Sequence, residues 1–568
     1  MRQVFLNTRA IRDERGSLSL FNIIMYILML AAIGFGWDVM RVEYERAALQ
    51  YNLDNAALAA ADLDQLDTPA TVVVNYMTAA GLGDYVSADD VIADTTNINS
   101  KTVYVAAERS FNSLFAGTVF ELTDMTSIDI PAVSEAKESV EDLEITLVLD
   151  TSGSMDEDTT YIDDNGATRT RSKLASLKVA AKDFVSDMVA KTEDGKLSIS
   201  IVPYAQQVSM PQEVFDLLPH SNEHSYSRCI NFRTSDYQRY GLILDGSRTY
   251  DQTYFFDDRS EYWVNDDDRS HGYSDGRYRN PDSLVYSYNC QNETWRDAML
   301  FQKDEETLHD YIDALGADGW TSIDVGVVWG AATLHEDFNA IINPLATPAS
   351  DGNSYVPAEF SDRPLDRNVR DSIKVLVVMT DGQNTTLREI KNNFRLDNTE
   401  TGIYWHEEDQ VYSQWSDTDN SYGYYEKRFT SPSDFFETNS SEPYKGDESI
   451  QLSFAELVAK APTEHIRTRF YAAIPDLENT NPRNNYGQRA KDTRTLDACA
   501  AVKSAGIQVY TIAFEAGADG EAVLDLDPTT GRGCASSQSH FFDAQGGQGL
   551  ENAFNAIATS ISQLRLTQ

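Results

Sequence analysis

Cysteine and basic residues are scarce in this sequence, and both shortages narrow the possible functions. The 568 residues include 4 cysteines, none in a Cys-x-x-Cys spacing, which argues against a zinc site or a dithiol redox site. Lysine and arginine number 46 against 90 aspartates and glutamates, so the formal net charge is -44. Nucleic-acid binding needs clustered basic side chains, and this charge balance therefore excludes a nucleic-acid partner. The acidity indicates a strongly solvated surface, a cation-rich setting or a basic partner.

One long apolar run lies near the N-terminus. Residues 16–37, GSLSLFNIIMYILMLAAIGFGW, carry no charge, and about 22 residues are enough to cross a hydrocarbon core as a helix. Four arginines precede the run: Arg2, Arg9, Arg12 and Arg15. The positive-inside rule then predicts a cytoplasmic N-terminus and an extracytoplasmic chain after Asp38. A cleaved signal peptide and a buried core helix are the alternatives.

The helical pattern continues over 39–63, and the whole N-terminal stretch resembles a known family. An Arg-Gly precedes the apolar run, an Asp follows it, and Leu-Gln and Asn-Ala-Ala-Leu-Ala come later. This order of features resembles the N-terminal segment of TadG-like proteins of the Tad (Flp) pilus assembly system. The resemblance implies a single-pass protein of the bacterial inner membrane with a periplasmic C-terminal domain. Pilins of the wider class carry Glu where this chain has Phe21, so processing into a pilus subunit is not predicted.

The domain organisation follows from changes in pattern along the chain. Residues 1–65 are predicted to form the cytoplasmic tip, the transmembrane helix and its helical extension. Residues 66–140 are predicted to form a small α+β stalk, with a helix over 70–80 and strands near 102–107 and 126–133. The third predicted domain is 141–568.

Alternating strands and helices in the third domain predict its fold. LEITLVLD, KLSISIVPY, IKVLVVMT and GIQVYTIAF are short apolar runs typical of buried parallel strands. Helices are predicted over 172–189, 322–335, 490–504 and 550–564 from apolar residues at three- and four-residue intervals. The fold class is therefore α/β, with a doubly wound, mostly parallel sheet. Ligands of such sheets lie at the carboxyl ends of the strands, where Asp150 and Asp381 both fall.

The loop after the first of these strands reads DTSGS, and it fits the pattern Asp-x-Ser-x-Ser. This pattern resembles the metal-ion-dependent adhesion site of von Willebrand factor type A domains. The resemblance implies a divalent cation, Mg²⁺ or alternatively Mn²⁺ or Ca²⁺, held by hydroxyl and carboxylate oxygens. The ligands that it implies are Asp150, Ser152, Ser154, Thr321 and Asp381.

Structural roles are the alternatives for these residues. Asp150, Ser152 and Ser154 also suit a turn that caps the next helix, because Asp and Ser are common capping residues. Asp381 also suits an ordinary turn, and Thr321, with Ser322 beside it, also suits a helix N-cap.

Long insertions interrupt the predicted α/β domain at about 206–300, 340–370 and 385–490. The first and third are rich in Tyr, which predicts either a recognition surface or a surface elaboration with its own packing. Cys229 and Cys290 flank part of the first insertion, and Cys499 and Cys534 flank the last buried strand. Their order along the chain predicts these two pairs as disulfides in an oxidising compartment.

The predicted function is a non-enzymatic, membrane-anchored component of Tad pilus assembly. In the family that the loop resembles, an acidic side chain of a protein partner completes the coordination of the ion. A surface adhesin for host or matrix ligands is one alternative. A metal-dependent hydrolase is another, but no His or Lys stands beside Asp150 in the sequence, and His220, His224 and His406 lie in the insertions.

Overall fold

The computed structural model divides the chain into two compact units. One comprises Met1–Val140 with Ser562–Gln568, and the other comprises Glu141–Ile561. The structure describes residues 15–62, 65, 67–94, 100–112, 127–139, 142–163, 165–255, 288–290, 293–348, 354–367, 372–395, 401–416, 419–426, 437–461, 463, 466, 470, 483–525, 527 and 530–564. The predicted cytoplasmic tip, with Arg2, Arg9 and Arg12, lies outside these residues.

Helix α1 (Arg15–Ala61, 47 residues) is the longest helix of the first unit. Within the described part of the chain, it is the one helix long and apolar enough to cross a membrane, and this follows from length and composition alone. Its first half leaves large apolar side chains such as Ile27 and Phe35 exposed in the isolated chain. This fits the predicted membrane anchor, since a membrane would cover such a surface.

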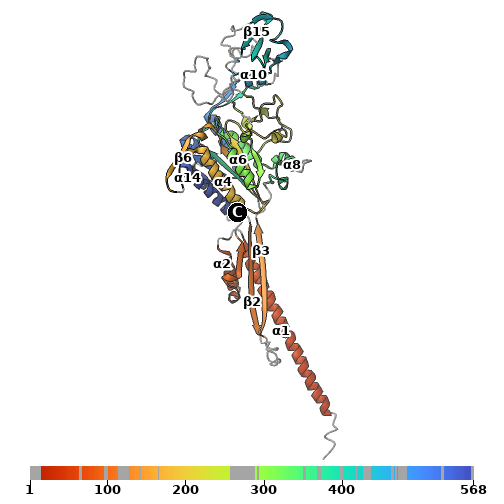
Figure 1. Cartoon of the computed structure of the whole chain (residues 1–568). Coiled ribbons are helices and arrows are strands. Elements are labelled where there is room, and N and C mark those ends of the chain that lie inside the picture. The colour runs from red at the N-terminus through yellow and green to blue at the C-terminus, as the bar shows by residue number, and fades with distance from the viewer. Residues whose placement is uncertain are drawn as a thin grey trace, which may run out of the picture. The chain divides into compact units, whose positions relative to one another are not determined.

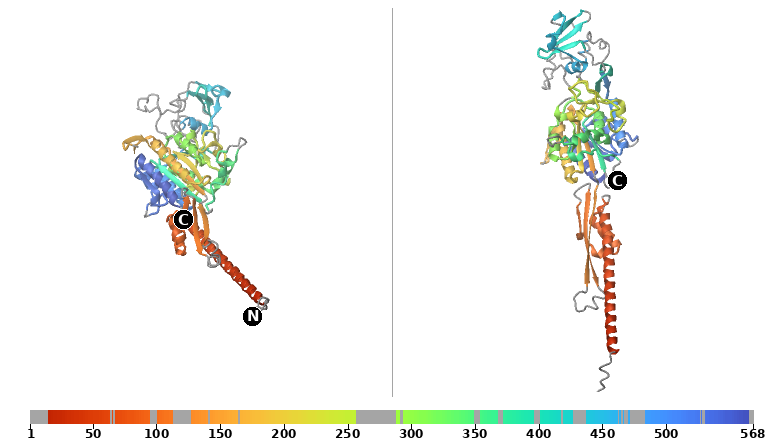
Figure 2. Two further views of the ribbon diagram at one scale, coloured as in Figure 1. Left: turned by 60° about the horizontal axis from the view of Figure 1, so that its bottom comes forward. Right: turned by 90° about the vertical axis from the view of Figure 1, so that its right-hand side faces the viewer.

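The second half of α1 packs on the stalk, as Figures 1 and 2 show. The stalk consists of α2 (Pro69–Ala79) and a three-stranded antiparallel sheet of β1 (Val91–Asp94), β2 (Ser100–Asn112) and β3 (Ser127–Ser139). Leu49, Leu53 and Ala56 of α1 share a core with Val103 and Val105 of β2. The alanines of this helix therefore serve close packing within its own unit.

The second unit is built on a six-stranded sheet with the order β10-β7-β4-β11-β19-β20. Its strands are β4 (Asp142–Asp150), β7 (Leu197–Tyr204), β10 (Met299–Gln302), β11 (Ser372–Thr380), β19 (Gln508–Phe514) and β20 (Phe541–Ala544). All neighbours are parallel except β10, an antiparallel edge strand. The prediction of a doubly wound, mostly parallel α/β sheet is confirmed.

Helices cover both faces of this sheet. Val148 and Leu376 pack with α7 (Ile323–Leu334) and α12 (Gln488–Ser504) on one face. Successive side chains of a strand point to opposite faces, and Tyr510 meets α14 (Gly546–Leu564) on the other, with its hydroxyl 2.8 Å from that of Ser560. α4 (Lys173–Lys191) packs on α14 through Phe184. The four main helices predicted from periodicity thus correspond to α4, α7, α12 and α14.

Shorter elements complete the domain. Between β4 and α4 lies a hairpin of β5 (Asp158–Ile162) and β6 (Thr168–Ser172). The first insertion contains α5 (Gln212–Phe215), β8 (Ile230–Asn231) and β9 (Asp251–Gln252), and α6 (Glu305–Ala314) follows β10. The second contains α8 (Asn339–Ala346), and α13 (Gly517–Leu524) follows β19.

The third insertion folds as a small sheet of its own. β12 (Leu387–Ile390) and β18 (Arg483–Tyr486) pair at its base. Beyond them lie α9 (Asn392–Arg395), β13 (Ile403–His406), β14 (Val411–Ser416), β15 (Ser421–Glu426), β16 (Glu437–Ser440), β17 (Ile450–Gln451) and α10 (Phe454–Lys460). Trp405, Tyr412 and Phe454 belong to a hydrophobic core separate from that of the large sheet. The insertion therefore has its own packing.

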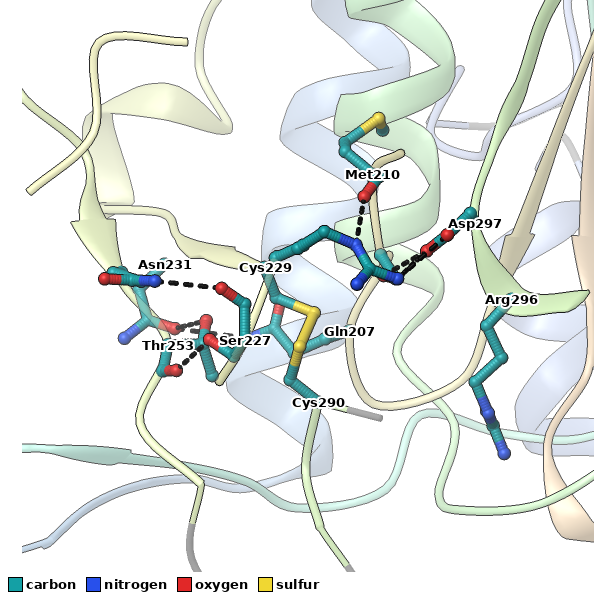
Figure 3. The surroundings of a disulfide bond; sticks show 12 residues. Gln207, Met210, Ser227, Cys229, Asn231, Thr253, Cys290, Arg296 and Asp297 are labelled. Atoms are coloured by element: carbon teal, nitrogen blue, oxygen red, sulfur yellow. Dashed lines mark hydrogen bonds and ion pairs between the residues drawn. A yellow bond between two sulfur atoms is a disulfide. The ribbon is translucent and has the colours of Figure 1, made fainter. Parts of the chain in front are cut away.

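Both predicted disulfides are present. Cys229 bonds to Cys290 across a sequence separation of 61, and Cys499 bonds to Cys534 across 35. Figure 3 shows the first of them beside the chain at Met210 and Asp297. There Arg228 donates to the Met210 carbonyl (2.9 Å) and to the Asp297 carboxylate (2.8 Å). The disulfide and the contacts of Arg228 together tie the loop around Cys229 to the segment that leads into β10.

Replacing both cysteines of one pair with serine is expected to lower the free energy of unfolding by about 2 to 4 kcal/mol, because each bond closes a long loop in the unfolded chain. Denaturation of the C229S/C290S and C499S/C534S proteins measures this loss. Non-reducing peptide mapping of the wild type checks the pairing itself. Four free thiols or a crossed pairing would contradict it.

Candidate functional site

The candidate site lies where the order of the strands reverses. β4 and β11 are neighbours in the sheet, although their first residues, Asp142 and Ser372, are 230 positions apart in the sequence. From β4 the chain first builds the sheet outward through β7 and β10, and then crosses back to β11 and continues through β19 and β20. Such a switch point leaves a crevice at the carboxyl ends of the two central strands. Asp150 ends β4 there, and Asp381 directly follows β11.

Side-chain oxygens from two loops meet at this point. The hydroxyl oxygens of Ser152 and Ser154 are 3.0 Å apart, and the Ser154 hydroxyl donates to Oδ1 of Asp381 at 2.7 Å. The Gly153 amide donates to the Gly319 carbonyl at 2.9 Å, which fixes the turn between the two serines. A Cβ at Gly153 would lie 3.3 Å from that carbonyl oxygen, so glycine permits this close approach.

Asp150 is fully buried, as is the neighbouring Ser152. Its Oδ1 accepts from the Ser152 amide (2.8 Å), and its Oδ2 accepts from the Thr380 hydroxyl (2.6 Å). The Tyr204 hydroxyl lies 3.4 Å from the same Oδ2. Burial, and then the negative charge of Asp381, raise the pKa of Asp150 to about 7. Hydrogen bonds thus fix both oxygens of Asp150. Because the buried carboxylate lies near Asp381, a positive charge close to them would stabilise the ionised forms of both.

Lys173 supplies one positive charge to the site. Its ammonium lies 3.2 Å from Oδ2 of Asp381 and 3.5 Å from Oε2 of Glu157. Burial opposes the charged form of Lys173, but the carboxylates of Asp381 and Glu157 outweigh it and raise the pKa of the lysine. Burial likewise raises the pKa of Asp381, while the hydroxyl of Ser154 and the charge of Lys173 act against this rise.

Thr321 lies in the loop next to these residues. Its amide donates to the Thr385 hydroxyl (3.0 Å), and its carbonyl accepts from the Thr385 amide (3.0 Å) and from the Lys491 ammonium (2.9 Å). Among the described residues, no hydrogen bond joins the Thr321 hydroxyl to the other four predicted ligands. The structure therefore brings Asp150, Ser152, Ser154 and Asp381 into one cluster and Thr321 to its border.

Of the structural alternatives, the caps by Ser152 and by Thr321 find no matching hydrogen bond, whereas the bond from the Ser152 amide to Asp150 also suits a turn. Ser152 stands at the N-cap position of a short 3₁₀ helix (Gly153–Asp156), but its side chain makes no capping bond. The N-cap of α7 is Ser322 instead of Thr321, and it too makes no side-chain capping bond. The Ser152 hydroxyl lies against that of Ser154 instead, and the Ser322 hydroxyl accepts from Lys491.

The cluster fits a small divalent cation. Adjacent ligands of an octahedral Mg²⁺ lie about 3 Å apart, as expected for Mg–O bonds of about 2.1 Å. In this structure the separations of 3.0 Å between the two serine oxygens and 2.7 Å between Ser154 and Asp381 are hydrogen bonds, and their lengths are close to this value. The donors are hydroxyl and carboxylate oxygens, which hard cations prefer. Ser152, Ser154 and Asp381 would hold the ion, and Asp150 would fix the loop through the Ser152 amide.

Sequence analysis missed three residues of the site: Tyr204, Thr380 and Lys173. Thr380 directly precedes Asp381, and Lys173 begins the helix after the DTSGS motif, so both lie next to residues that sequence analysis had singled out. Neither residue carries a sequence pattern of its own, because its contact with the cluster depends on which strands are neighbours in the sheet.

The fold and the site together define an α/β protein with a long apolar N-terminal helix and an oxygen cluster at its switch point. Residues 16–63 match the family model described as Flp pilus-assembly TadE/G-like. The N-terminal segment is thus TadE/G-like, as the sequence predicted. No curated protein matches the chain.

Solved structures with some similarity include domains of pili. The pilus adhesin SpaC from Lactobacillus rhamnosus GG is 11% identical over 84% of this chain and 33% of its own, with a TM-score of 0.26. The von Willebrand factor domain of a type V pili tip protein from Porphyromonas gingivalis is 14% identical over 76% of this chain and 97% of its own, with a TM-score of 0.29. This chain spans about a third of the length of SpaC.

Proposed function

We propose that this chain is a non-enzymatic, membrane-anchored component of Tad (Flp) pilus assembly in the bacterial inner membrane. Its N-terminus lies in the cytoplasm, and its α/β domain binds a protein of the pilus or secretion apparatus in the periplasm. Binding runs through a divalent cation, Mg²⁺ first, held by Asp150, Ser152, Ser154 and Asp381, with Thr321 in the adjacent loop. The observation that carries the proposal is the cluster of their oxygens at the switch point.

The partner is expected to contribute an acidic side chain. Two serines and two carboxylates do not fill the six positions of an octahedral cation, and Mg²⁺ tolerates ligands from a second molecule. When bound, the ion supplies a positive charge that attracts a carboxylate oxygen. The high net negative charge of this chain, -44, works against any acidic partner at long range. A local, ion-mediated contact offsets that repulsion.

A binding role suits the site better than catalysis. Asp150 is fully buried and fixed by hydrogen bonds. Lys173 is paired with two carboxylates that raise its pKa, so it stays protonated near neutral pH and cannot act as a base. The three histidines that sequence analysis considered belong to the insertions.

The topology is tested by reporter fusions in the membrane of a bacterial host. Alkaline phosphatase fused after Gln65 is expected to be active, because the arginines before α1 hold the N-terminus in the cytoplasm. A cytoplasmic reporter fused at the same residue is expected to be inactive. The reverse pattern would overturn the orientation.

The partner-binding role is tested by cross-linking in intact envelopes, followed by purification of the full chain. Partners of the pilus apparatus are expected to co-purify in Mg²⁺ and to be lost when EDTA is added before cross-linking. The D150A/S152A protein, purified in Mg²⁺, is expected to resemble the chelated wild type. Recovery of host or matrix ligands in place of pilus components would instead favour a surface adhesin. Partners that resist both EDTA and the substitution would refute the ion-mediated contact.

A further inference from the structure

A buried lysine lies inside the candidate metal site, where local structure gives no reason for it. The Lys173 side chain is 8% exposed, and lysines are rarely buried unless they are paired. It occupies the first position of α4, after the N-cap Ser172. The positive end of the helix dipole disfavours a cation there. The stability of α4 therefore does not explain this residue.

The β5–β6 hairpin places Lys173 against two carboxylates. The hairpin pairs Asp158 with Ser172, and one step further the Lys173 amide donates to the Glu157 carbonyl at 2.8 Å. This ladder keeps the backbones of Glu157 and Lys173 side by side at the edge of the metal loop. The ammonium then reaches Oδ2 of Asp381 at 3.2 Å and Oε2 of Glu157 at 3.5 Å.

The two partners of Lys173 differ in their surroundings. The Asp381 side chain is fully buried and shares its other oxygen with Ser154, whereas the Glu157 side chain is 69% exposed. Within the described residues, no other lysine or arginine forms an ion pair with Asp150 or Asp381. Through Oδ2, the ammonium thus neutralises Asp381, the carboxylate that the proposed divalent cation requires, while Ser154 donates to Oδ1 of the same residue.

We propose that Lys173 is a tethered cation that competes with the divalent ion for Asp381. Without the ion, the ammonium stabilises the buried carboxylates. When the ion enters, the ammonium leaves Asp381 and stays with Glu157, which is already within reach. Lys173 therefore lowers the affinity of the site, so that a higher free ion concentration is needed to fill it. This inference rests on the proposed function of the same site.

The test compares ion affinity in four forms of the full chain in detergent micelles, by calorimetric titration of Mg²⁺ and of Mn²⁺. K173M keeps an unbranched side chain of similar length without the charge. K182M is the matched control, since Lys182 lies on the same helix and pairs with Asp313 far from the site along α4. E157Q removes the second partner of the ammonium. Thermal melts with and without Mg²⁺ accompany each titration.

K173M is expected to bind either ion about tenfold more tightly than the wild type, because the competing charge lies within contact distance of the ligand. Its melting temperature without the ion should fall and should recover in Mg²⁺. K182M should match the wild type in affinity, and E157Q should bind the ion more weakly. If K173M does not fold without the ion, the weaker binding of E157Q still supports the proposal.

Equal affinity in all four proteins, or weaker binding by K173M, would overturn the tethered-cation proposal while leaving the metal site intact. Absence of binding in every form, including the wild type, would overturn the metal site and with it the competition. These two failures are therefore distinguishable.

Discussion

The full chain carrying D150A/S152A should lose divalent-ion binding while its fold persists. Ser152 offers its oxygen next to that of Ser154, and Asp150 holds the loop by accepting from the Ser152 amide. Removing a residue that only hydrogen-bonds to a metal ligand commonly weakens metal binding by about 10- to 100-fold. Removing Asp150 together with the Ser152 hydroxyl should therefore weaken binding by about 100-fold or more. Calorimetric titration of Mg²⁺ and Mn²⁺ measures the loss.

The fold should survive because these side chains serve the site and not the core. The strands beneath it are buried along their length, and α4 buries Leu177, Phe184 and Met188 independently of the loop. Burying the Asp150 carboxylate near Asp381 also costs free energy when no ion is present, so its removal relieves that cost. The melting temperature without the ion should be unchanged or higher. Stabilisation by added Mg²⁺ should disappear, since it depends on binding by mass action.

The chain offers a matched control for this experiment. Asp245 and Ser247 have the same spacing, and the Ser247 amide donates to Oδ1 of Asp245 at 2.9 Å, as Ser152 does to Asp150. Both control residues are exposed on the first insertion. The D245A/S247A protein should bind the ion like the wild type. Wild-type binding by D150A/S152A would refute the metal site, and an unfolded D150A/S152A protein would show that these residues are structural.

The strands and helices of the large sheet could be predicted because each carries its own local pattern. LEITLVLD is apolar almost throughout, and the structure buries it as the central strand β4. The helix after Ser172 repeats Leu174, Leu177 and Phe184 on one face, and all three are buried. Asp150 and Asp381 were recognised for the same reason, since Asp150 ends one such strand and Asp381 directly follows another. Local periodicity decides these features without knowledge of the neighbours.

The edge strands and the third insertion carried weaker signals. β10 and β20 span only four residues each, too few for a periodic pattern. In the insertion, aromatic residues occupy both faces of the small sheet: Trp405 and Tyr412 lie in its core, while Tyr404 and Tyr422 contact each other at 5.6 Å outside that core. The alternation that marks a half-buried strand is therefore hidden.

The interior of the site could not be predicted because it depends on contacts distant in sequence. The hydrogen bond from Thr380 to Asp150 joins residues 230 positions apart, and the ion pair of Lys173 with Asp381 spans 208. Both exist only because β4 and β11 are neighbours and the hairpin folds back on the loop. Composition and spacing hold no information on such pairs.

Helix α7 shows a second consequence of tertiary packing, namely the need for two glycines. All of its residues are buried, and Gly326 and Gly330 are four positions apart, on one face. A Cβ at Gly330 would lie 2.4 Å from Cγ2 of Val148 and 2.7 Å from Cδ1 of Leu376. A Cβ at Gly326 would lie 2.8 Å from the ring of Tyr204. The glycines thus let α7 lie directly on β4 and β11.

Gly330→Val is therefore expected to lower the free energy of unfolding by about 3 kcal/mol, the upper part of the usual range for overpacking, since strands on both sides block any adjustment. Pulse proteolysis of the full chain in increasing urea measures the midpoint of unfolding of the α/β domain.

Gly487→Val is the matched control, because a Cβ at Gly487 meets nothing within 4 Å. Gly487 is the N-cap of α12, where valine is less favoured than glycine, so this protein should lose about 1 kcal/mol at most. Because α7 begins two residues after Thr321, Gly330→Val should also displace the adjacent loop of the metal site and weaken ion binding. An unchanged midpoint for Gly330→Val would mean that α7 does not pack on β4 and β11 as closely as the structure shows.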